Sequence, residues 1–247
     1  MQRRDDSTPA AARPHSSIIV PEPTPAQQIA AVLFSGGLDS AVLVALAARE
    51  GPVQPLYVSV GLAWEAAERA AAARFLASLP ADRVRPMAAL RVDMTDVYPP
   101  THWAIRGEAP GFDTPDEDVY LEGRNVILLS KAAVFMARAG IARVWIGPLA
   151  GNPFPDATAE FFAAFARALT IGLAAPIAVT APFSTLHKSD VIRRGLDLGV
   201  PLELTLSCMQ PREGLHCGRC SKCRERRDAF AEAGVQDPTS YAEAPIR

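Results

Sequence analysis

Residues 33–40 read Leu-Phe-Ser-Gly-Gly-Leu-Asp-Ser, and they join the end of an apolar run at 31–34 to an alanine- and leucine-rich stretch at 41–49. That order predicts a buried strand, a tight turn and a helix. Because Gly36 and Gly37 have no Cβ atom, a phosphate can come close to the backbone N–H groups of such a turn. The stretch therefore predicts a phosphate-binding loop or, in the simpler interpretation, an ordinary strand-to-helix turn.

The polar side chains of this loop favour the first interpretation. Ser35 and Ser40 add hydroxyl donors, and Asp39 is placed to hold Mg²⁺ against the same phosphates. No lysine follows the glycines, so this is not the Gly-Lys-Ser/Thr loop of kinases and GTPases. The string Ser-Gly-Gly-x-Asp-Ser resembles the PP-loop of the ATP pyrophosphatases, which cleave ATP to AMP and pyrophosphate. The loop residues that we expect to bind ATP are Ser35, Gly36, Gly37, Leu38, Asp39 and Ser40.

Length and composition limit the class of protein. A chain of 247 residues with 49% hydrophobic residues can bury one good core. It contains no run of roughly 20 apolar residues, which a membrane span needs, and residues 1–24 are too charged and proline-rich for a secretory signal. We therefore expect a cytoplasmic protein with a flexible tail at 1–28. The net charge of −2 argues against charge-driven nucleic-acid binding.

Strand-like and helix-like segments alternate through most of the chain. This alternation predicts an α/β fold with a doubly wound, mainly parallel sheet over 29–206, followed by a small C-terminal segment at 207–247. Ligands of such sheets bind beyond the carboxyl ends of the strands, where the glycine loop falls. The strands are expected at 31–34, 53–60, 87–92, 142–146 and 177–181, and the helices at 41–49, 62–78, 126–139, 157–169 and 189–198.

Two neighbouring segments carry candidate substrate contacts. Residues 99–122 form a long connection without periodicity, which we interpret as a cover over the site, with His102 and Trp103 contacting a planar substrate. A disordered surface loop with a packed tryptophan is the alternative. Arg124 and Asn125 then open a predicted helix, and a guanidinium beside free N–H groups makes a good anion site. An arginine at a helix start is, however, commonly a solvated surface residue.

Further candidates follow the later strands. Phe154 and Asp156 stand where the loop after the strand at 142–146 would reach the site, and Asp156 is either a site residue or the cap of the next helix. Lys188 lies near another helix start, an unfavourable place for a cation that a nearby anion would explain. His187 beside it is either a general base or, as a lone histidine more often is, a surface residue.

Four cysteines near the C-terminus follow the spacing C-x8-C-x2-C-x2-C. Two consecutive x2 turns can bring several thiolates to one centre at ~2.3 Å, as tetrahedral Zn²⁺ requires. An iron–sulfur cluster also takes four cysteines, whereas disulfides are disfavoured in the expected compartment. A closed four-sulfur site leaves no position for water, so we expect a structural zinc site rather than a catalytic one. The expected ligands are Cys208, Cys217, Cys220 and Cys223.

The glycine loop, residues 123–130, residues 187–201 and the cysteine segment together resemble the 7-cyano-7-deazaguanine synthase (QueC) family over about residues 31–241. That family converts a carboxylate on a deazaguanine to a nitrile with ATP, Mg²⁺ and ammonia. The resemblance implies a carbon–nitrogen ligase of queuosine-type biosynthesis, and it makes a homodimer plausible. It also implies that Asp39 holds Mg²⁺ and that Arg124 and Lys188 face phosphates or the substrate carboxylate. The expected substrate contacts are Asn125, Phe154, Asp156 and Trp103.

Three positions depart from the family's usual pattern. Ala157 and Thr158 stand where Cys-Arg is usual, Gly61-Leu62-Ala63-Trp64 replaces a polar pattern, and Leu206 replaces a common aromatic residue. The residues expected to bind ATP thus match the family's pattern, whereas some of the residues expected to surround the substrate differ from it. A relative that forms an amide with another acid or amine, and a module that binds ATP and a partner without turnover, are the alternatives.

Overall fold

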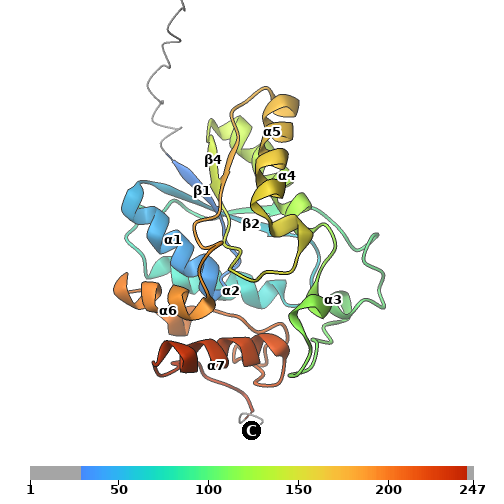
Figure 1. The fold of residues 1–247 in the computed structure, drawn as a ribbon, viewed down its shortest axis with the longest axis vertical. Helices are drawn as coiled ribbons and strands as arrows, with labels where there is room; N and C mark the ends of the chain where they lie inside the picture. The colour runs from blue at the N-terminus through green and yellow to red at the C-terminus, as the bar shows by residue number, and fades with distance from the viewer. Residues whose placement is uncertain (1–28, 244–247) are drawn as a thin grey trace, which may run out of the picture.

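The computed structural model describes residues 29–243, so the tail predicted at 1–28 lies outside the described residues. Five parallel strands form one sheet in the order β3-β2-β1-β4-β5, with β1 at its centre (Figure 1). The order reverses at β1, because β2 and β3 lie on one side of it and β4 and β5 on the other. The prediction of a doubly wound parallel sheet is confirmed. The strands are β1 (Ala30–Leu33), β2 (Val53–Ser59), β3 (Ala88–Arg91), β4 (Arg143–Trp145) and β5 (Ala178–Thr180).

Helices cover both faces of the sheet, and the alternation along β1 shows why. Ala31 and Leu33 point into a core formed with α4 (Arg124–Ala139) and α5 (Ala159–Leu173). Ala30 and Val32 point into the opposite core. Successive side chains of a strand face opposite ways, so a central strand covered on both faces must be apolar throughout. The helices of the second core are α1 (Leu38–Glu50), α2 (Glu65–Ala77), α6 (Lys188–Asp197) and α7 (Ser221–Ala233).

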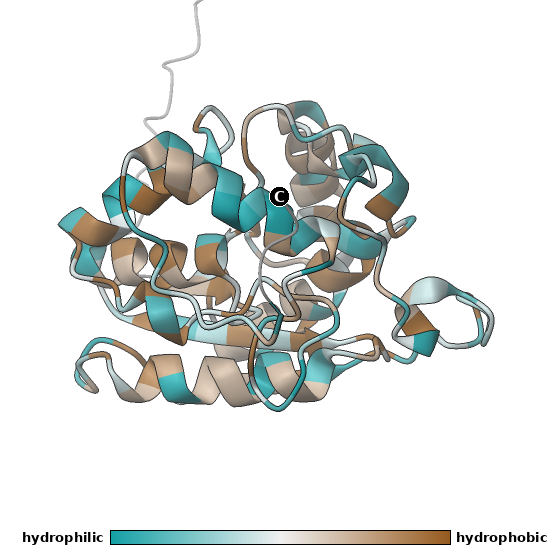
Figure 2. Ribbon diagram, turned by 90° about the horizontal axis from the view of Figure 1, so that it is seen from below, coloured by the Kyte–Doolittle hydropathy of each residue, from teal (hydrophilic) through white to brown (hydrophobic). Residues whose placement is uncertain are grey.

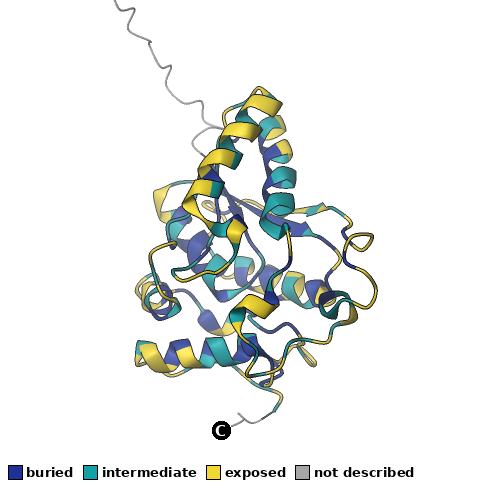
Figure 3. Cartoon of the chain, turned by 45° about the vertical axis from the view of Figure 1, so that its right-hand side comes forward, coloured by how far each residue is buried: buried dark blue, intermediate teal, exposed yellow. Residues whose placement is uncertain are grey.

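Burial follows the same layers. The inner strands β1, β2 and β4 are mostly buried and the edge strands β3 and β5 are not, while exposed residues gather on the outer sides of the helices and in the loops (Figure 3). Hydrophobic and hydrophilic residues alternate along the helices, as expected of helices that bury one face (Figure 2). Within residues 29–243, no helix combines the length and the apolar character that crossing a membrane would require.

The connection at 99–122 has more structure than predicted. It contains a short helix, α3 (Trp103–Arg106), and a 3-10 turn, η1 (Asp116–Val119). The Trp103 ring stacks on Trp64, with ring centroids 5.7 Å apart and an interplanar angle of 10°. This stacking holds the connection against the body of the protein. The alternative interpretation is therefore right about a packed tryptophan and wrong about disorder.

Two further 3-10 turns, η2 (Pro155–Ala157) and η3 (Leu202–Leu204), precede α5 and the cysteine segment. The helix predicted at 157–169 begins two residues later and extends to Leu173. Its cap is Thr158, whose hydroxyl accepts a hydrogen bond from the backbone N–H of Phe161 at 3.1 Å. The interpretation of Asp156 as the cap of this helix is therefore wrong.

Candidate active site and metal centre

The glycine loop links the carboxyl end of β1 to the start of α1. Gly36 has φ = 79°, and a Cβ atom there would lie 2.9 Å from the backbone of α2, at Glu68 O and Ala72 N. Both the left-handed backbone and the close approach thus require glycine at this position. Leu38 differs from the other loop residues, because its side chain is buried in the core and only its backbone can face a ligand.

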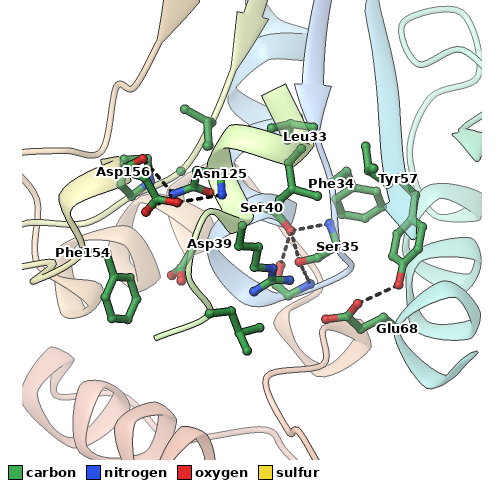
Figure 4. A pocket seen from close by; sticks show the side chains of 18 of the residues that line it. Leu33, Phe34, Ser35, Asp39, Ser40, Tyr57, Glu68, Asn125, Phe154 and Asp156 are labelled. Carbon is green, nitrogen blue, oxygen red and sulfur yellow. Dashed lines mark hydrogen bonds between the residues drawn. The ribbon is translucent and has the colours of Figure 1, made fainter. Parts of the chain in front are cut away.

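Hydrogen bonds within the loop fix its shape before any ligand binds. The Ser40 hydroxyl donates to the Gly37 carbonyl at 3.0 Å and accepts from the Ser35 N–H at 3.3 Å (Figure 4). The Gly36 carbonyl accepts from the backbone N–H of Leu206 at 2.8 Å. The loop is therefore attached to the segment that leads into the cysteines, far away in the sequence.

Two adjoining cavities open at this end of the sheet, with volumes of about 280 Å³ and about 360 Å³. The smaller lies against the ends of β1 and β2 and the start of α4, and the larger extends toward the cysteine segment. They have one wall in common, so two ligands bound in them would meet at the glycine loop. The shared wall includes Ser35, Gly37, Asp39, Glu68, Arg124, Gly147, Asn152 and Phe154.

Asp39 lies at the entrance of α1 and shares a lysine with a second carboxylate. The Lys188 ammonium lies 3.3 Å from Asp39 Oδ2 and also pairs with Glu225 of α7. Burial alone would lower the pKa of Lys188, but the two carboxylates outweigh it and raise the pKa. Burial also dominates at Asp39 and raises the pKa of its carboxyl, against the attraction of Lys188. The anion expected beside Lys188 is therefore a pair of protein carboxylates.

The free oxygen of Asp39 fits a bound cation. Asp39 Oδ1 is buried and has no hydrogen-bond partner among residues 29–243. A carboxylate oxygen is the ligand type that Mg²⁺ prefers, and Mg²⁺ commonly binds one or two carboxylates together with substrate phosphates. The position of Asp39 beside the glycine loop meets both requirements.

The start of α4 is held from a distant segment. Asp156 accepts a hydrogen bond from the backbone N–H of Asn125 at 2.9 Å, and the Asn125 amide donates to the Asp156 carbonyl at 3.1 Å (Figure 4). Asp156, which lies in η2, therefore caps the start of α4 rather than the start of the following helix α5. This orients Arg124, whose Nε is buried without a hydrogen-bond partner in the described part of the chain.

The four expected substrate contacts do not all meet in the cavities. Phe154 lines both of them and stacks on Tyr120, with centroids 4.9 Å apart. Asn125 and Asp156 line the smaller cavity. Trp103 is absent from the lining of either cavity and packs against Trp64, which lines the larger one. A direct contact between Trp103 and substrate stays a prediction.

Among the polar lining residues that sequence reasoning missed are Glu68 of the shared wall and Tyr57 of the smaller cavity. Glu68 accepts hydrogen bonds from the Tyr57 hydroxyl at 2.8 Å and from the Trp64 indole N–H at 3.1 Å. Burial raises the pKa of Glu68 above its usual range, while the positive charge of Arg124 opposes the rise. Glu68 belongs to an alanine-rich helix that also contains Glu65, and nothing in the sequence distinguishes the two glutamates as site residues.

The C-terminal cysteines converge on one point. The four sulfur atoms lie within 4.8 Å of one another, and all four side chains are buried. Backbone N–H groups donate hydrogen bonds to the sulfurs. The Cys217 N–H donates to Cys208 Sγ at 3.2 Å, and the Arg219 N–H donates to Cys217 Sγ at 3.4 Å. Such donors stabilise thiolates, so the group fits a tetrahedral metal such as Zn²⁺.

Comparison with known proteins gives a consistent result. The family described as "Queuosine biosynthesis protein QueC" matches residues 29–234. A 7-cyano-7-deazaguanine synthase of Anaeromyxobacter dehalogenans is 37% identical over 227 residues, covering 86% of this chain and 95% of that protein. Proteins of the same name from Methanospirillum hungatei and Methanothrix thermoacetophila are 35% and 37% identical, covering 86% of this chain and 99% and 98% of those proteins.

A comparison with solved structures also gives distant matches. An NMN synthetase from Francisella tularensis matches with a TM-score of 0.38 and 18% identity, covering 86% of this chain and 79% of that one. The family match spans the sheet, the glycine loop and the four cysteines, and the curated relatives are covered almost completely. This chain belongs to the QueC family.

Proposed function

We propose that this protein is an ATP-dependent ligase that converts 7-carboxy-7-deazaguanine into 7-cyano-7-deazaguanine with ammonia. The observation that carries the proposal is the pair of cavities with a shared wall at the glycine loop, in a chain of the QueC family. One cavity can hold the nucleotide and the other the acid, so that the carboxylate meets the α-phosphate at this wall. Positioning of two reactants in this way accounts for a large part of catalysis.

The chemistry needs no protein nucleophile. A carboxylate oxygen attacks the α-phosphorus of ATP, pyrophosphate leaves, and an acyl adenylate forms. Ammonia then attacks the acyl carbon and AMP leaves, which gives the amide. A second ATP activates the amide oxygen in the same way, and loss of that oxygen with AMP, together with two protons, gives the nitrile.

The residues of the site have separate roles in this reaction. Backbone and hydroxyl groups of Ser35, Gly37 and Ser40 hold the departing pyrophosphate, and Arg124 stabilises the negative charge that develops on the α-phosphate. Asp39 would hold Mg²⁺, which neutralises phosphate charge when it is bound. Zn²⁺ on the four cysteines would have a structural role. The proposal places the enzyme in the cytoplasm, where ATP is present and thiols stay reduced.

The positions that depart from the family's usual pattern bear mainly on which product the enzyme forms. Ala157 and Thr158 line neither cavity, whereas Trp64 and Leu206 line the larger one. An enzyme that stops at the amide, or passes the acyl group to another amine, is the second candidate function because of these two wall residues.

The test is pyrophosphate release by the purified protein with ATP, Mg²⁺ and ammonium, with and without 7-carboxy-7-deazaguanine, and with products identified by mass spectrometry. Nitrile and AMP formed only with the acid would support the proposal. Amide as the final product would favour the second candidate. Absence of any acid-dependent pyrophosphate release would overturn the proposal, and ATP binding without turnover would favour a partner-binding module.

A further inference from the structure

Lys188 lies between two parts of the molecule that are far apart in the sequence. Its ammonium group contacts Asp39 of the glycine loop at 3.3 Å and Glu225 of α7. The lysine side chain is 13% exposed, and the two carboxylates are 26% and 23% exposed. In Figure 1, α7 lies along the lower edge of the molecule, next to α6, which begins with Lys188. The triad therefore joins the nucleotide loop to the C-terminal segment.

The position of Lys188 in its helix makes these carboxylates important. Lys188 is the first residue of α6, where the helix dipole disfavours a cation. A buried ammonium at such a place needs anionic partners. Asp39 and Glu225 supply them, and Lys222 adds a second cation 2.6 Å from the other oxygen of Glu225. Glu225 is thus the central anion of a small charge network.

Asp39 cannot serve Lys188 and a divalent cation equally well. The proposed reaction uses the Asp39 carboxylate for Mg²⁺, and the family resemblance implies that the Lys188 ammonium faces a phosphate or the substrate carboxylate. If Asp39 were the single partner of Lys188, the ammonium on Oδ2 and a metal on the free Oδ1 would share one negative charge and repel each other. Glu225 removes this conflict, since it can keep the ammonium in place after Asp39 has turned to the metal.

We infer that Glu225 is a positioning residue for the ATP site: it holds Lys188 within reach of the phosphates and leaves Asp39 available for Mg²⁺. This inference rests on the proposed function, because it takes the glycine loop to be the site of pyrophosphate. The C-terminal segment then does more than stabilise the fold. Glu225 follows the cysteine Cys223 by two residues on α7, so the metal cluster would determine where Glu225 lies.

The variants Glu225→Gln and Glu225→Asp test the inference, with Glu232→Gln as the matched control. Glu232 is two turns further along α7 and is exposed, and its substitution removes the same charge. Binding of inorganic pyrophosphate is measured by calorimetry at a series of Mg²⁺ concentrations, and thermal unfolding and metal content are recorded for each protein. The binding measurement needs no turnover.

We expect Glu225→Gln to raise the Mg²⁺ concentration needed for half-maximal pyrophosphate binding by about fivefold or more, the effect of removing one nearby charge. High Mg²⁺ should restore binding, Glu225→Asp should recover part of the loss, and Glu232→Gln should behave as the unmodified protein does. A merely structural residue would not give a defect that Mg²⁺ reverses.

Two results would overturn the inference alone. In the first, Glu225→Gln binds pyrophosphate with unchanged Mg²⁺ dependence. In the second, it loses binding at every Mg²⁺ concentration together with its thermal stability. If the unmodified protein binds no pyrophosphate with Mg²⁺ at all, the proposed function itself fails, and this inference fails with it.

Discussion

The cavities and the cysteine segment each contain an arginine with buried guanidinium atoms, but the two arginines differ in whether those atoms have hydrogen-bond partners. Arg226 of α7 is fully buried, and every nitrogen of its guanidinium donates a hydrogen bond. Arg124 at the cavities has a buried Nε without such a partner in residues 29–243. An unsatisfied buried donor costs about 1–3 kcal/mol, so it persists where a ligand can satisfy it. The groups that accept from Arg226 are Thr205, Thr239, Ser207 and the Leu202 carbonyl.

Two carboxylates at the cavities repeat this contrast. Glu65 is buried, and its oxygens accept from the Ser59 hydroxyl at 2.5 Å and the Val60 N–H at 2.6 Å. Asp39 has one oxygen on Lys188 and one without a hydrogen-bond partner in the described part of the chain. Glu65 is therefore held as part of the scaffold, whereas Asp39 keeps one oxygen available where ATP and its metal are proposed to bind.

The largest effect is expected from loss of the metal that the four cysteines are proposed to bind. Structural zinc contributes about 10–16 kcal/mol of apparent binding energy in small zinc domains. We expect a chelator, or Cys223→Ser, to unfold the C-terminal segment and to abolish ATP turnover, because the Leu206 contact to Gly36 is then lost. Metal analysis, thermal unfolding and pyrophosphate release measure these losses together.

Arg219→Ala is the control for this experiment, because Arg219 lies between two of the cysteines yet its side chain is 57% exposed. It should keep its metal and its activity. A protein purified with four free thiols, full stability and no bound metal would contradict the metal site, and a visible iron–sulfur absorption band would identify a different metal.

Arg226→Met should have the next largest effect, on stability. Arg226 Nε lies 3.6 Å from Asp237 Oδ1, and both side chains are largely buried. The change leaves Asp237 and the hydroxyls that accept from Arg226 without their cation, and breaking one side of a buried pair costs about 3–5 kcal/mol. Denaturant unfolding should show this loss, while Arg193→Ala, at an exposed ion pair, should change the free energy of unfolding by about 1 kcal/mol or less. Equal midpoints for the two variants would show that the buried guanidinium of Arg226 contributes no more to stability than an exposed one.

Arg124→Ala should show the opposite behaviour, with a large loss of activity and little loss of stability. Removing one preorganised donor costs about 10²–10³ in rate in comparable sites. We expect kcat/KM for acid-dependent pyrophosphate release to fall by that amount while the midpoint of unfolding stays nearly constant. Arg138→Ala, in the last turn of the same helix and exposed, is the matched control. A drop in stability comparable to that of Arg226→Met would show that Arg124 belongs to the scaffold.

The smallest effect concerns two cap residues of different helices, Thr158 of α5 and Asp156 of α4. Thr158→Ala removes the cap of α5 and should cost about 1 kcal/mol of stability without changing turnover. Asp156→Ala removes the link to Asn125 at the start of α4 and should reduce turnover as well. Comparing the two variants in unfolding and in pyrophosphate release separates the roles. Unchanged turnover in Asp156→Ala would place Asp156 with the scaffold.

The features that depend only on residues close together in the sequence were predictable from it. The glycine loop, the order of strands and helices and the cysteine spacing all express local geometry, because backbone conformation, hydrophobic period and short chelate turns are properties of a few consecutive residues. The parallel sheet, the loop at the end of β1 and the convergence of the four sulfurs follow from these patterns.

Tertiary structure alone decided which distant side chains meet. It placed Glu225 of α7 on Lys188 of α6, Asp156 on the start of α4, and Glu68 beside the glycine loop. It also stacked Trp103 on Trp64 instead of exposing it to the cavities. Each contact joins segments whose separation in space depends on how whole helices pack, and no local pattern of residues carries that information. The sequence by itself determined the fold and the chemistry of its motifs, whereas packing determined which charges face one another at the site.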